Sequence, residues 1–401
     1  MTVAAPGAEP ARDYDVLIAG AGLVGLALAP ALVGLGLRVA LADRMPVAMP
    51  ALPDGDADWD PRVYAISPGS ATFLRSVGGW QALPPERITA VESMRVAGDG
   101  GATIAFSAYD LGERALAWIV EERALRAALV PCARIAGVDT YAPRSFAALA
   151  WSADAGTLDF DDGTRVTARL VVAADGLHSW VRGAAGIEAA IKPYGQTAVV
   201  AHFGCERAHH GCARQWFLPD GGILAWLPLP GHRISIVWSA PAALAAELLA
   251  LDAPALAARV AAAGQHALGV LETLAPPAAF PLAFMRLPAS IAHRLALVGD
   301  AAHGIHPLAG QGVNLGFGDA EALCAVLRER GPVTDAGAPA LLERYARRRV
   351  EPVQAMQTVT DGLVRLFGAS NPLLKALRNL GMSAVDRLPL AKRLLAQSAL
   401  H

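Results

Sequence analysis

The stretch Gly20-Ala21-Gly22-Leu23-Val24-Gly25 decides the fold of this chain. It follows a short apolar run from Val16 to Ala19, which predicts a buried parallel strand, and it opens a stretch whose apolar residues recur at helical spacing. A strand, a glycine-rich turn and a helix in this order are typical of a dinucleotide-binding fold. The spacing therefore predicts an α/β domain built on a parallel sheet.

Each glycine of this motif has a separate role in such a fold. Gly20 permits the tight turn, Gly22 lets backbone amides approach a diphosphate, and Gly25 lets the helix pack closely on the strand. The phosphates would lie at the helix N-terminus, which favours anions. A second strand, Arg38 to Ala42, ends at Asp43, where this unit usually places a carboxylate for a ribose hydroxyl. We predict Asp43 as the ribose ligand; the alternative is a plain tight turn with Asp43 on the surface.

The composition favours a small-molecule partner. The chain of 401 residues has 34 basic and 36 acidic residues, a balance that argues against binding nucleic acid by bulk electrostatics. The cysteines form no CxxC pair and show no metal-ligand spacing, so we expect structural thiols, a reducing compartment and no metal. Residues 1–13 lack the features of a secretory signal and predict a flexible tail. We therefore expect a cytoplasmic protein.

Two further glycine-bearing segments follow predicted strands. Asp175-Gly176-Leu177-His178-Ser179 comes after the apolar run Arg169 to Ala174, and Gly299-Asp300 comes after the apolar run Leu295 to Val298. The carboxyl ends of such strands are where open α/β sheets bind ligands. Gly310-Gln311-Gly312 follows shortly afterwards. Three such segments in this order are typical of a chain that binds a single flavin.

The pattern changes between about residues 190 and 285. Gln215 to Leu218, Ile223 to Leu229 and Arg233 to Trp238 are separated by turn residues and predict an antiparallel meander. A large antiparallel sheet inserted into a dinucleotide domain would form a second wall over the cofactor. The first two of these strands are strongly apolar, which suits an apolar ligand; the alternative is ordinary sheet core.

With these segments in view, the chain resembles the single-component flavin aromatic hydroxylases typified by para-hydroxybenzoate hydroxylase, and more narrowly the ubiquinone-biosynthesis hydroxylase family. The resemblance covers most of its length. The supporting segments are 62–67, 194–201, 299–316, 345–349 and 361–367. The resemblance implies an α/β fold with a Rossmann-like FAD-binding domain, an inserted antiparallel β-sheet substrate domain and a helical C-terminal region.

The expected domain bounds follow from this organisation. They are 1–13 for the flexible tail; 14–80, 105–185 and 286–330 for the discontinuous FAD-binding domain; 81–104 and 190–285 for the substrate-binding β-sheet domain; and 331–401 for the helical C-terminal region.

The resemblance implies FAD as cofactor, with NAD(P)H and O2 as co-substrates. Asp300 would bind a ribityl hydroxyl, and Gly310 to Gly312 would start a helix whose amides face the flavin edge that becomes negative on reduction. Asn314 would add a side-chain donor, and Arg44 and Arg62 are candidates for the cofactor phosphates. The expected cofactor-binding residues are Gly20, Gly22, Gly25, Asp43, Arg44, Arg62, Arg123, Asp175, Gly299, Asp300, Pro307, Gly310, Gln311, Gly312 and Asn314.

One position departs from the family pattern. Glu122 stands where these hydroxylases generally carry an uncharged amide or an arginine near the cofactor chain. A carboxylate near a diphosphate would repel it. We therefore expect either that Glu122 points away or that the neighbouring Arg123 compensates.

The function implied by the resemblance is hydroxylation of a phenolic ring, that of a polyprenylated ubiquinone precursor, through a flavin C4a-hydroperoxide. The cofactor supplies the difficult chemistry, while the protein holds the ring and excludes water. The candidates to activate the phenol are His303, His306 and Tyr194; for His303 the alternative is a packed histidine beside the cofactor loop. The alternative functions are hydroxylation of a soluble aromatic acid, a non-hydroxylating FAD oxidoreductase and a non-catalytic flavoprotein scaffold.

The end of the chain is basic and amphipathic. From Leu363 onward, apolar residues at helical spacing alternate with basic ones, and Asp386 is the one acid; the basic residues are Arg365, Lys375, Arg378, Arg387, Lys392 and Arg393. Such a segment rests on an anionic membrane surface or docks on an acidic partner; the alternative is a packed terminal helix with a solvated basic face. The resemblance favours peripheral contact at the inner face of the membrane, or contact with a quinone-biosynthesis complex.

Overall fold

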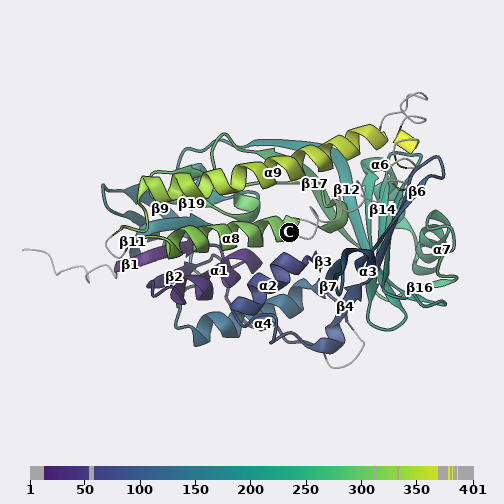
Figure 1. The fold of residues 1–401 in the computed structure, drawn as a ribbon, viewed down its shortest axis with the longest axis horizontal. Helices are drawn as coiled ribbons and strands as arrows, with labels where there is room; N and C mark the ends of the chain where they lie inside the picture. The colour runs from purple at the N-terminus through teal and green to yellow at the C-terminus, as the bar shows by residue number, and fades with distance from the viewer. Residues whose placement is uncertain are drawn as a thin grey trace, which may run out of the picture.

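The computed structural model describes residues 13–53, 58–310, 312–331 and 334–368, together with residues 378, 379, 382 and 386. Two large sheets lie at opposite ends of the long axis of the molecule, and the long helix α9 (Pro339–Gly368) runs over both (Figure 1). The expected α/β fold with an inserted antiparallel sheet and a helical C-terminal region is confirmed. Residues 1–12 of the expected tail lie outside the described residues.

The first sheet is mainly parallel. Its strand order is β18-β19-β11-β1-β2-β8, with β10 added to β11 and β9 added to β10. The four pairs that join β19, β11, β1, β2 and β8 are all parallel, whereas β10 runs antiparallel to both of its neighbours. The strands are β1 (Asp13–Ala19), β2 (Val39–Ala42), β8 (Asp139–Tyr141), β9 (Phe146–Trp151), β10 (Gly156–Phe160), β11 (Arg165–Ala173), β18 (Ile291–Ala292) and β19 (Leu295–Leu297).

Strand β1 is buried on both faces because its side chains alternate between two cores. Val16 and Ile18 belong to the core that includes the helices on one face, whereas Leu17 and Ala19 belong to the core on the other face. This double burial explains why β1 reads as a continuous apolar run. The helices of the first core are α1 (Leu23–Val33), α2 (Pro68–Ser76), α4 (Glu122–Ile135), α8 (Gly312–Arg328) and the first turns of α9.

The second sheet is mainly antiparallel and contains the predicted meander. Its order is β16-β12-β15-β14-β13-β5-β6, with β17 also paired to β12; the β13–β5 pair is parallel. Helices α6 (Ala242–Ala250) and α7 (Ala253–Ala263) share one core with the sheet, in which Trp226 and Trp238 are fully buried. The strands are β5 (Ser93–Ala97), β6 (Thr103–Ser107), β12 (Ala190–Cys205), β13 (Cys212–Phe217), β14 (Ile223–Leu229), β15 (Arg233–Pro241), β16 (Leu271–Thr273) and β17 (Ala278–Arg286).

A small three-stranded sheet of order β3-β7-β4 lies between the two large ones. Strand β3 of this sheet leads into α2, whose N-cap is Ser67: the Ser67 hydroxyl accepts a hydrogen bond from the Ser70 amide at 3.2 Å. The remaining elements are β3 (Val63–Ile66), β4 (Ile88–Val91), β7 (Ala117–Glu121), α3 (Ala108–Leu111), α5 (Trp180–Ala184) and the short 3₁₀ turns η1 (Pro85–Arg87), η2 (Gly299–Ala301) and η3 (Leu308–Gly310).

Helix α9 ties the two large sheets together. Near its start the Tyr345 hydroxyl donates to the Leu297 carbonyl of the first sheet at 2.7 Å, and further along Gln357 donates to the Met285 carbonyl of the second sheet at 2.8 Å. At its end the ring of Phe367 stacks on that of Phe217. These contacts hold the two sheets in a fixed relation on either side of the region where the glycine motifs lie.

Candidate active site

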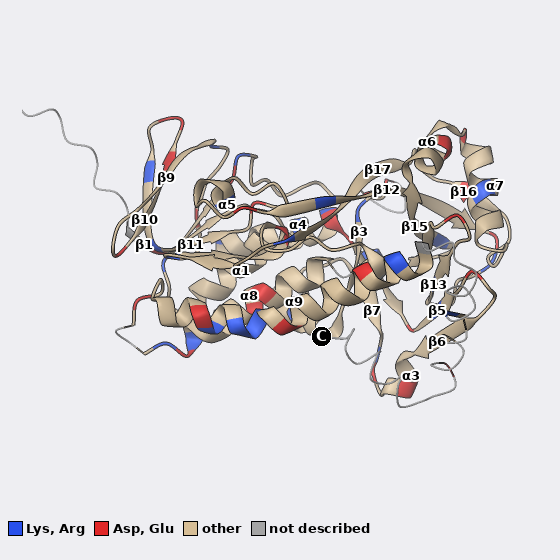
Figure 2. Cartoon of the chain, turned by 90° about the horizontal axis from the view of Figure 1, so that it is seen from above, with Lys and Arg blue, Asp and Glu red and all other residues tan. Residues whose placement is uncertain are grey.

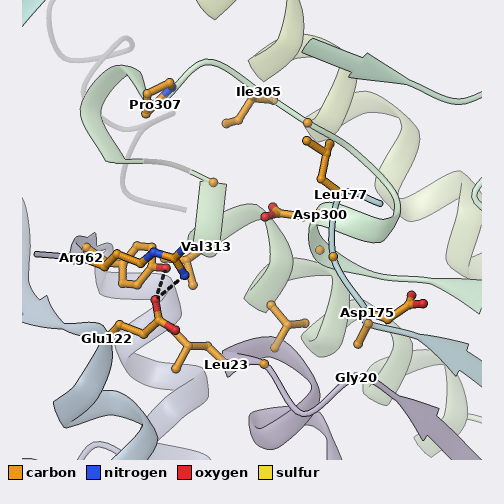
Figure 3. Close-up of a pocket in the computed structure, with 18 of the residues that line it drawn as sticks. Gly20, Leu23, Arg62, Glu122, Asp175, Leu177, Asp300, Ile305, Pro307 and Val313 are labelled. Carbon is orange, nitrogen blue, oxygen red and sulfur yellow. Dashed lines mark hydrogen bonds and ion pairs between the residues drawn. The ribbon is translucent and has the colours of Figure 1, made fainter. Parts of the chain in front are cut away.

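The three glycine-bearing segments open into one cavity of about 830 Å³. Gly20 and Gly22 line it from the β1–α1 turn, Asp175 from the end of β11, and Asp300 from the turn after β19 (Figure 3). Gly310 at the end of the η3 turn and Gly312 at the start of α8 also line it; the other lining residues from these segments are Leu23, Val24, Gly176, Leu177, Gly299, Gly304, Ile305, Pro307 and Val313. The expected convergence of the three segments is therefore confirmed.

Glycine is required at two positions of the first motif by close backbone contact. Gly20 has φ +112°, and a Cβ there would lie 2.3 Å from the Ala174 carbonyl oxygen; a Cβ on Gly25 would lie 2.0 Å from the Gly20 carbonyl oxygen. A Cβ on Gly22 would meet nothing within 4 Å. Gly20 and Gly25 therefore serve the packing of the protein, whereas the space at Gly22 belongs to the cavity.

Val24 connects the first motif to the third. A Cβ on Gly316 of α8 would lie 2.5 Å from the Val24 side chain, and one on Gly299 would lie 3.2 Å from it. The absence of side chains at these two glycines lets α1, α8 and the turn after β19 approach one another. Motifs that lie far apart in the sequence are thus in direct contact.

The carboxylates of Asp43 and Asp175 organise the edge of the cavity. Asp43 accepts hydrogen bonds from the amides of Ala21 at 2.6 Å and Met45 at 2.7 Å, and lines the cavity together with Arg44. Asp175 accepts hydrogen bonds from the Ser179 hydroxyl and from the Val181 amide. Asp43 therefore joins the end of β2 to the β1–α1 turn, whereas Asp175 fixes the loop that follows it.

Asp300 lines the cavity, and its side chain is exposed to that space (Figure 3). Desolvation by the protein packed around the cavity raises the pKa of its carboxyl, although His303 and Arg62 act in the opposite direction. No hydrogen bond to another described side chain engages it. The Asp300 carboxyl can therefore accept hydrogen bonds from a ligand in the cavity.

Comparisons with known proteins agree with this geometry. The family model described as the FAD binding domain matches residues 13–360. The chain belongs to this FAD-binding family. Ubiquinone hydroxylase UbiL of Rhodospirillum rubrum is 38% identical over 96% of this chain and 89% of the relative. The 3-demethoxyubiquinol 3-hydroxylase of Escherichia coli is 34% identical over 95% of this chain and 97% of the relative.

Solved structures share the fold of this FAD-binding family member. P. aeruginosa PqsL in complex with 2-aminobenzoylacetate superimposes with a TM-score of 0.75 at 24% identity, covering 92% of this chain and 99% of that one. Klebsiella pneumoniae HpxO, complexed with FAD and uric acid, superimposes with a TM-score of 0.72 at 19% identity, covering 96% of both chains. These likenesses show the fold alone.

The cavity residues fit FAD. The space beside Gly22 lies at the N-terminus of α1, where free amides favour a diphosphate, and Asp43 lies at the end of β2 beside it. Asp300 offers a carboxyl for a polyol chain, and α8 begins at Gly312 with its first amides near the cavity. Gln311 was expected at the same place but lies outside the described residues.

Glu122 lies in the lining of the cavity and is paired with Arg62. The Arg62 guanidinium donates to the Glu122 carboxylate at 3.2 Å, and so does the Tyr64 hydroxyl at 3.2 Å (Figure 3). Arg62 also stacks over the ring of Phe280. The expectation that Glu122 points away is wrong, and its compensating cation is Arg62. Arg123, expected at the site, is instead paired with Asp58 at 2.7 Å and does not line the cavity.

Asn314 has a different role from the one expected. Its amide nitrogen donates to the Ala65 carbonyl at 2.8 Å, and its oxygen accepts from the Ser67 amide at 3.0 Å. The residue is buried and does not line the cavity. It therefore binds α8 to the β3–α2 junction and is not directed at the cofactor.

The three candidates for activating a phenol do not line the cavity either. His303 bonds to Asp319 at 2.6 Å, so the alternative of a packed histidine describes it. His306 bonds to Gln196 at 3.0 Å, and burial lowers the pKa of His306 to about 4. Tyr194 packs edge-on against His306, and burial raises the pKa of its hydroxyl to about 12. At neutral pH both the His306 ring and the Tyr194 hydroxyl are therefore uncharged.

The second sheet supplies the apolar wall opposite the glycine motifs. On β14, Ala225 and Leu227 line the cavity, whereas Leu224 and Trp226 belong to the core under α6 and α7. The side chains alternate between the two faces, so the strand serves as cavity wall on one face and as sheet core on the other. The remaining wall residues of this sheet are Val237, Pro281, Leu282 and Ala283.

Sequence reasoning missed Val24, the Arg62–Glu122 pair and Asp319. Of these, only Asp319 could have been found from the sequence. It lies four residues from Leu315 and four from Leu323, and so shares their helical face. An acidic residue on an apolar face indicates a buried partner.

Proposed function

We propose that this chain is an FAD-dependent monooxygenase that uses NAD(P)H and O2 to hydroxylate the phenolic ring of a polyprenylated ubiquinone precursor. The observation that carries the proposal is the cavity itself. It has three converging glycine motifs on one side and an uncharged wall of sheet residues on the other. The membership of the FAD-binding family and the names of the two hydroxylase relatives support the same function.

The chain's own residues would hold the cofactor by contacts of different kinds. The N-terminus of α1 with Gly22 receives the diphosphate, Asp43 and Asp300 accept hydrogen bonds from ribose and ribityl hydroxyls, and the N-terminus of α8 faces the flavin. Bound FAD would accept electrons from NAD(P)H and activate O2. Arg62 lies at the edge of the same space and adds a cation near the phosphates.

The sheet wall would hold the substrate ring and keep water out. Ala225, Leu227 and Val237 present only apolar surface, and Pro281 to Ala283 continue it. A wall of this kind favours an uncharged ring with an apolar substituent, because an aromatic carboxylate would lose its hydration without gaining a cation from the wall. This property supports a prenylated phenol over a soluble aromatic acid.

Contact with a membrane is a further part of the proposal, because a polyprenyl tail partitions into a bilayer. Two of the basic residues of the C-terminal segment are paired within the chain: Arg365 with Asp361, and Arg378 with Asp99. The other four lie outside the described residues. No helix in the described ranges is both long enough and apolar enough to cross a bilayer. The contact that we propose is a peripheral one.

The test begins with the purified full-length protein. It should be yellow with about one FAD per chain, and a prenylated phenol should accelerate NAD(P)H oxidation with matching O2 uptake. Incorporation of labelled oxygen from O2 into the product distinguishes hydroxylation from other flavin chemistry. Faster turnover of a soluble aromatic acid, or NAD(P)H oxidation without labelled product, would contradict the proposal. Flotation with anionic liposomes tests the membrane contact separately.

A further inference from the structure

Asp319 is a buried acidic residue of α8 that does not line the cavity. It is 1% exposed and shares its helical face with the buried Leu315 and Leu323. Burying a carboxylate costs several kcal/mol unless other groups pair with it. The structure supplies three such groups: two come from the turn after β19 and one from helix α9.

The Asp319 carboxylate joins η2 and α9 to α8. One oxygen accepts a hydrogen bond from the Gly299 amide at 2.8 Å and also bonds to the His303 ring at 2.6 Å. The other oxygen accepts from the Arg349 guanidinium at 2.6 Å, and Arg349 also donates to the Leu315 carbonyl at 3.0 Å. Asp319 is therefore the common partner of the turn after β19 and of helix α9.

The turn that Asp319 holds is the one that carries Asp300. Gly299 has φ +59°, and its carbonyl accepts from the amides of Ala302 at 2.8 Å and His303 at 3.1 Å. Asp319 binds the first residue of this turn through the Gly299 amide and the last through the His303 side chain. Asp300, between them, is directed into the cavity (Figure 3). The position of the Asp300 carboxyl thus depends on a carboxylate outside the cavity.

The charges in this cluster support the arrangement. Burial lowers the pKa of His303, but Asp319 and Asp300 outweigh it, so that its pKa is raised overall. Burial raises the pKa of Asp319, but His303, Arg349 and the Gly299 amide outweigh it, so that its pKa is lowered overall. The two shifts thus favour a positive charge on His303 and a negative charge on Asp319, which also faces the Arg349 guanidinium.

We propose that Asp319 is a positioning residue of the cofactor site: it fixes the turn that presents Asp300 to the polyol chain of FAD. The proposal rests on the proposed function, because it takes FAD as the ligand of the cavity. It predicts that Asp319 affects FAD binding through Asp300, whereas an acid with a general structural role would affect FAD binding independently of Asp300.

The experiment is a double-mutant cycle on FAD affinity in the full-length protein. Asp319→Asn should weaken FAD binding by about tenfold or more, whereas in an Asp300→Ala background the same change should add less than about twofold. The matched control is Asp335→Asn. It breaks the ion pair in which Asp335 lies 2.6 Å from Arg294, and neither residue lines the cavity. It should lower the melting temperature and leave the FAD affinity within about twofold of the parent.

The outcomes separate the two proposals. Equal losses of FAD affinity in both backgrounds, or an unchanged affinity in Asp319→Asn, would overturn the positioning role while leaving FAD as the ligand. Failure of the unmodified protein to bind FAD would instead overturn the proposed function. If Asp319→Asn does not fold, His303→Gln removes the imidazole partner of Asp319 and leaves Asp319 and Arg349 in place. It should weaken FAD binding by about fivefold with Asp300 present and have no effect without it.

Discussion

The guanidinium of Arg62 lies 3.2 Å from the carboxylate of Glu122 at the edge of the cavity. The two residues are far apart in the sequence, and Tyr64 donates to the same carboxylate from β3. Arg62 is about half exposed. Arg62 thus partly offsets the charge of Glu122 that a cofactor phosphate would meet here. Glu122 also competes with the phosphates for Arg62.

We expect Glu122→Gln to tighten FAD binding. The substitution removes a negative charge beside the diphosphate site and frees Arg62. Each effect is worth about 1 kcal/mol in a solvated setting, and together they predict about a thirtyfold gain in affinity. Arg62→Gln should weaken binding. Titration of FAD into each variant checks both. The neutral control is Asp159→Asn, which removes a partly exposed carboxylate paired with Arg165. Weaker binding by Glu122→Gln would show that the carboxylate mainly anchors Arg62 and Tyr64.

Gly25 and Gly22 should respond differently to alanine. In Gly25→Ala the new Cβ meets the Gly20 carbonyl, so the helix must shift and we expect a loss of about 1–3 kcal/mol in the free energy of unfolding even without FAD. In Gly22→Ala the Cβ meets only the cavity, so the apoprotein should keep its stability and lose the increase in melting temperature that FAD confers. Thermal unfolding with and without FAD separates the two. Gly362→Ala, with open space around it, is the control, and equal behaviour of the two variants would refute the distinction.

The sequence pattern predicted the elements around the cavity better than it predicted the side-chain partners. The glycine spacing located the turn at Gly20 and the close contact of α1 at Gly25, because packing leaves room for no side chain at either position. The alternation on β14 left open which face of the strand lines the cavity, and that depends on where α6 and α7 pack. Asn314 could not be assigned, because its partners Ala65 and Ser67 come from a distant part of the chain.

The pKa of His306 predicts how stability depends on pH. Its folded pKa is about 4, below the ordinary 6.5, so the unfolded chain binds the proton more readily between these values. The stabilisation is complete above pH 6.5 and is lost as the pH falls toward 4. For a shift of this size it amounts to about 3 kcal/mol. We expect the difference in unfolding free energy between the wild type and His306→Gln to shrink over this range, as measured by urea denaturation. A constant difference would contradict the assignment.

The buried pair of Arg378 and Asp99 predicts that part of the basic C-terminal segment stabilises the fold. The two side chains are 1% and 3% exposed, and Arg378 also donates to the Leu366 carbonyl and stacks on Phe367. Arg378→Met should therefore cost about 3–5 kcal/mol, because Asp99 loses its cationic partner in a buried setting. Arg365→Met is the matched control. Its ion pair with Asp361 is 70% exposed on the arginine side, so we expect a change below about 0.5 kcal/mol. Urea denaturation measures both. A small effect of Arg378→Met combined with weaker liposome flotation would assign this arginine to the membrane surface instead of the fold.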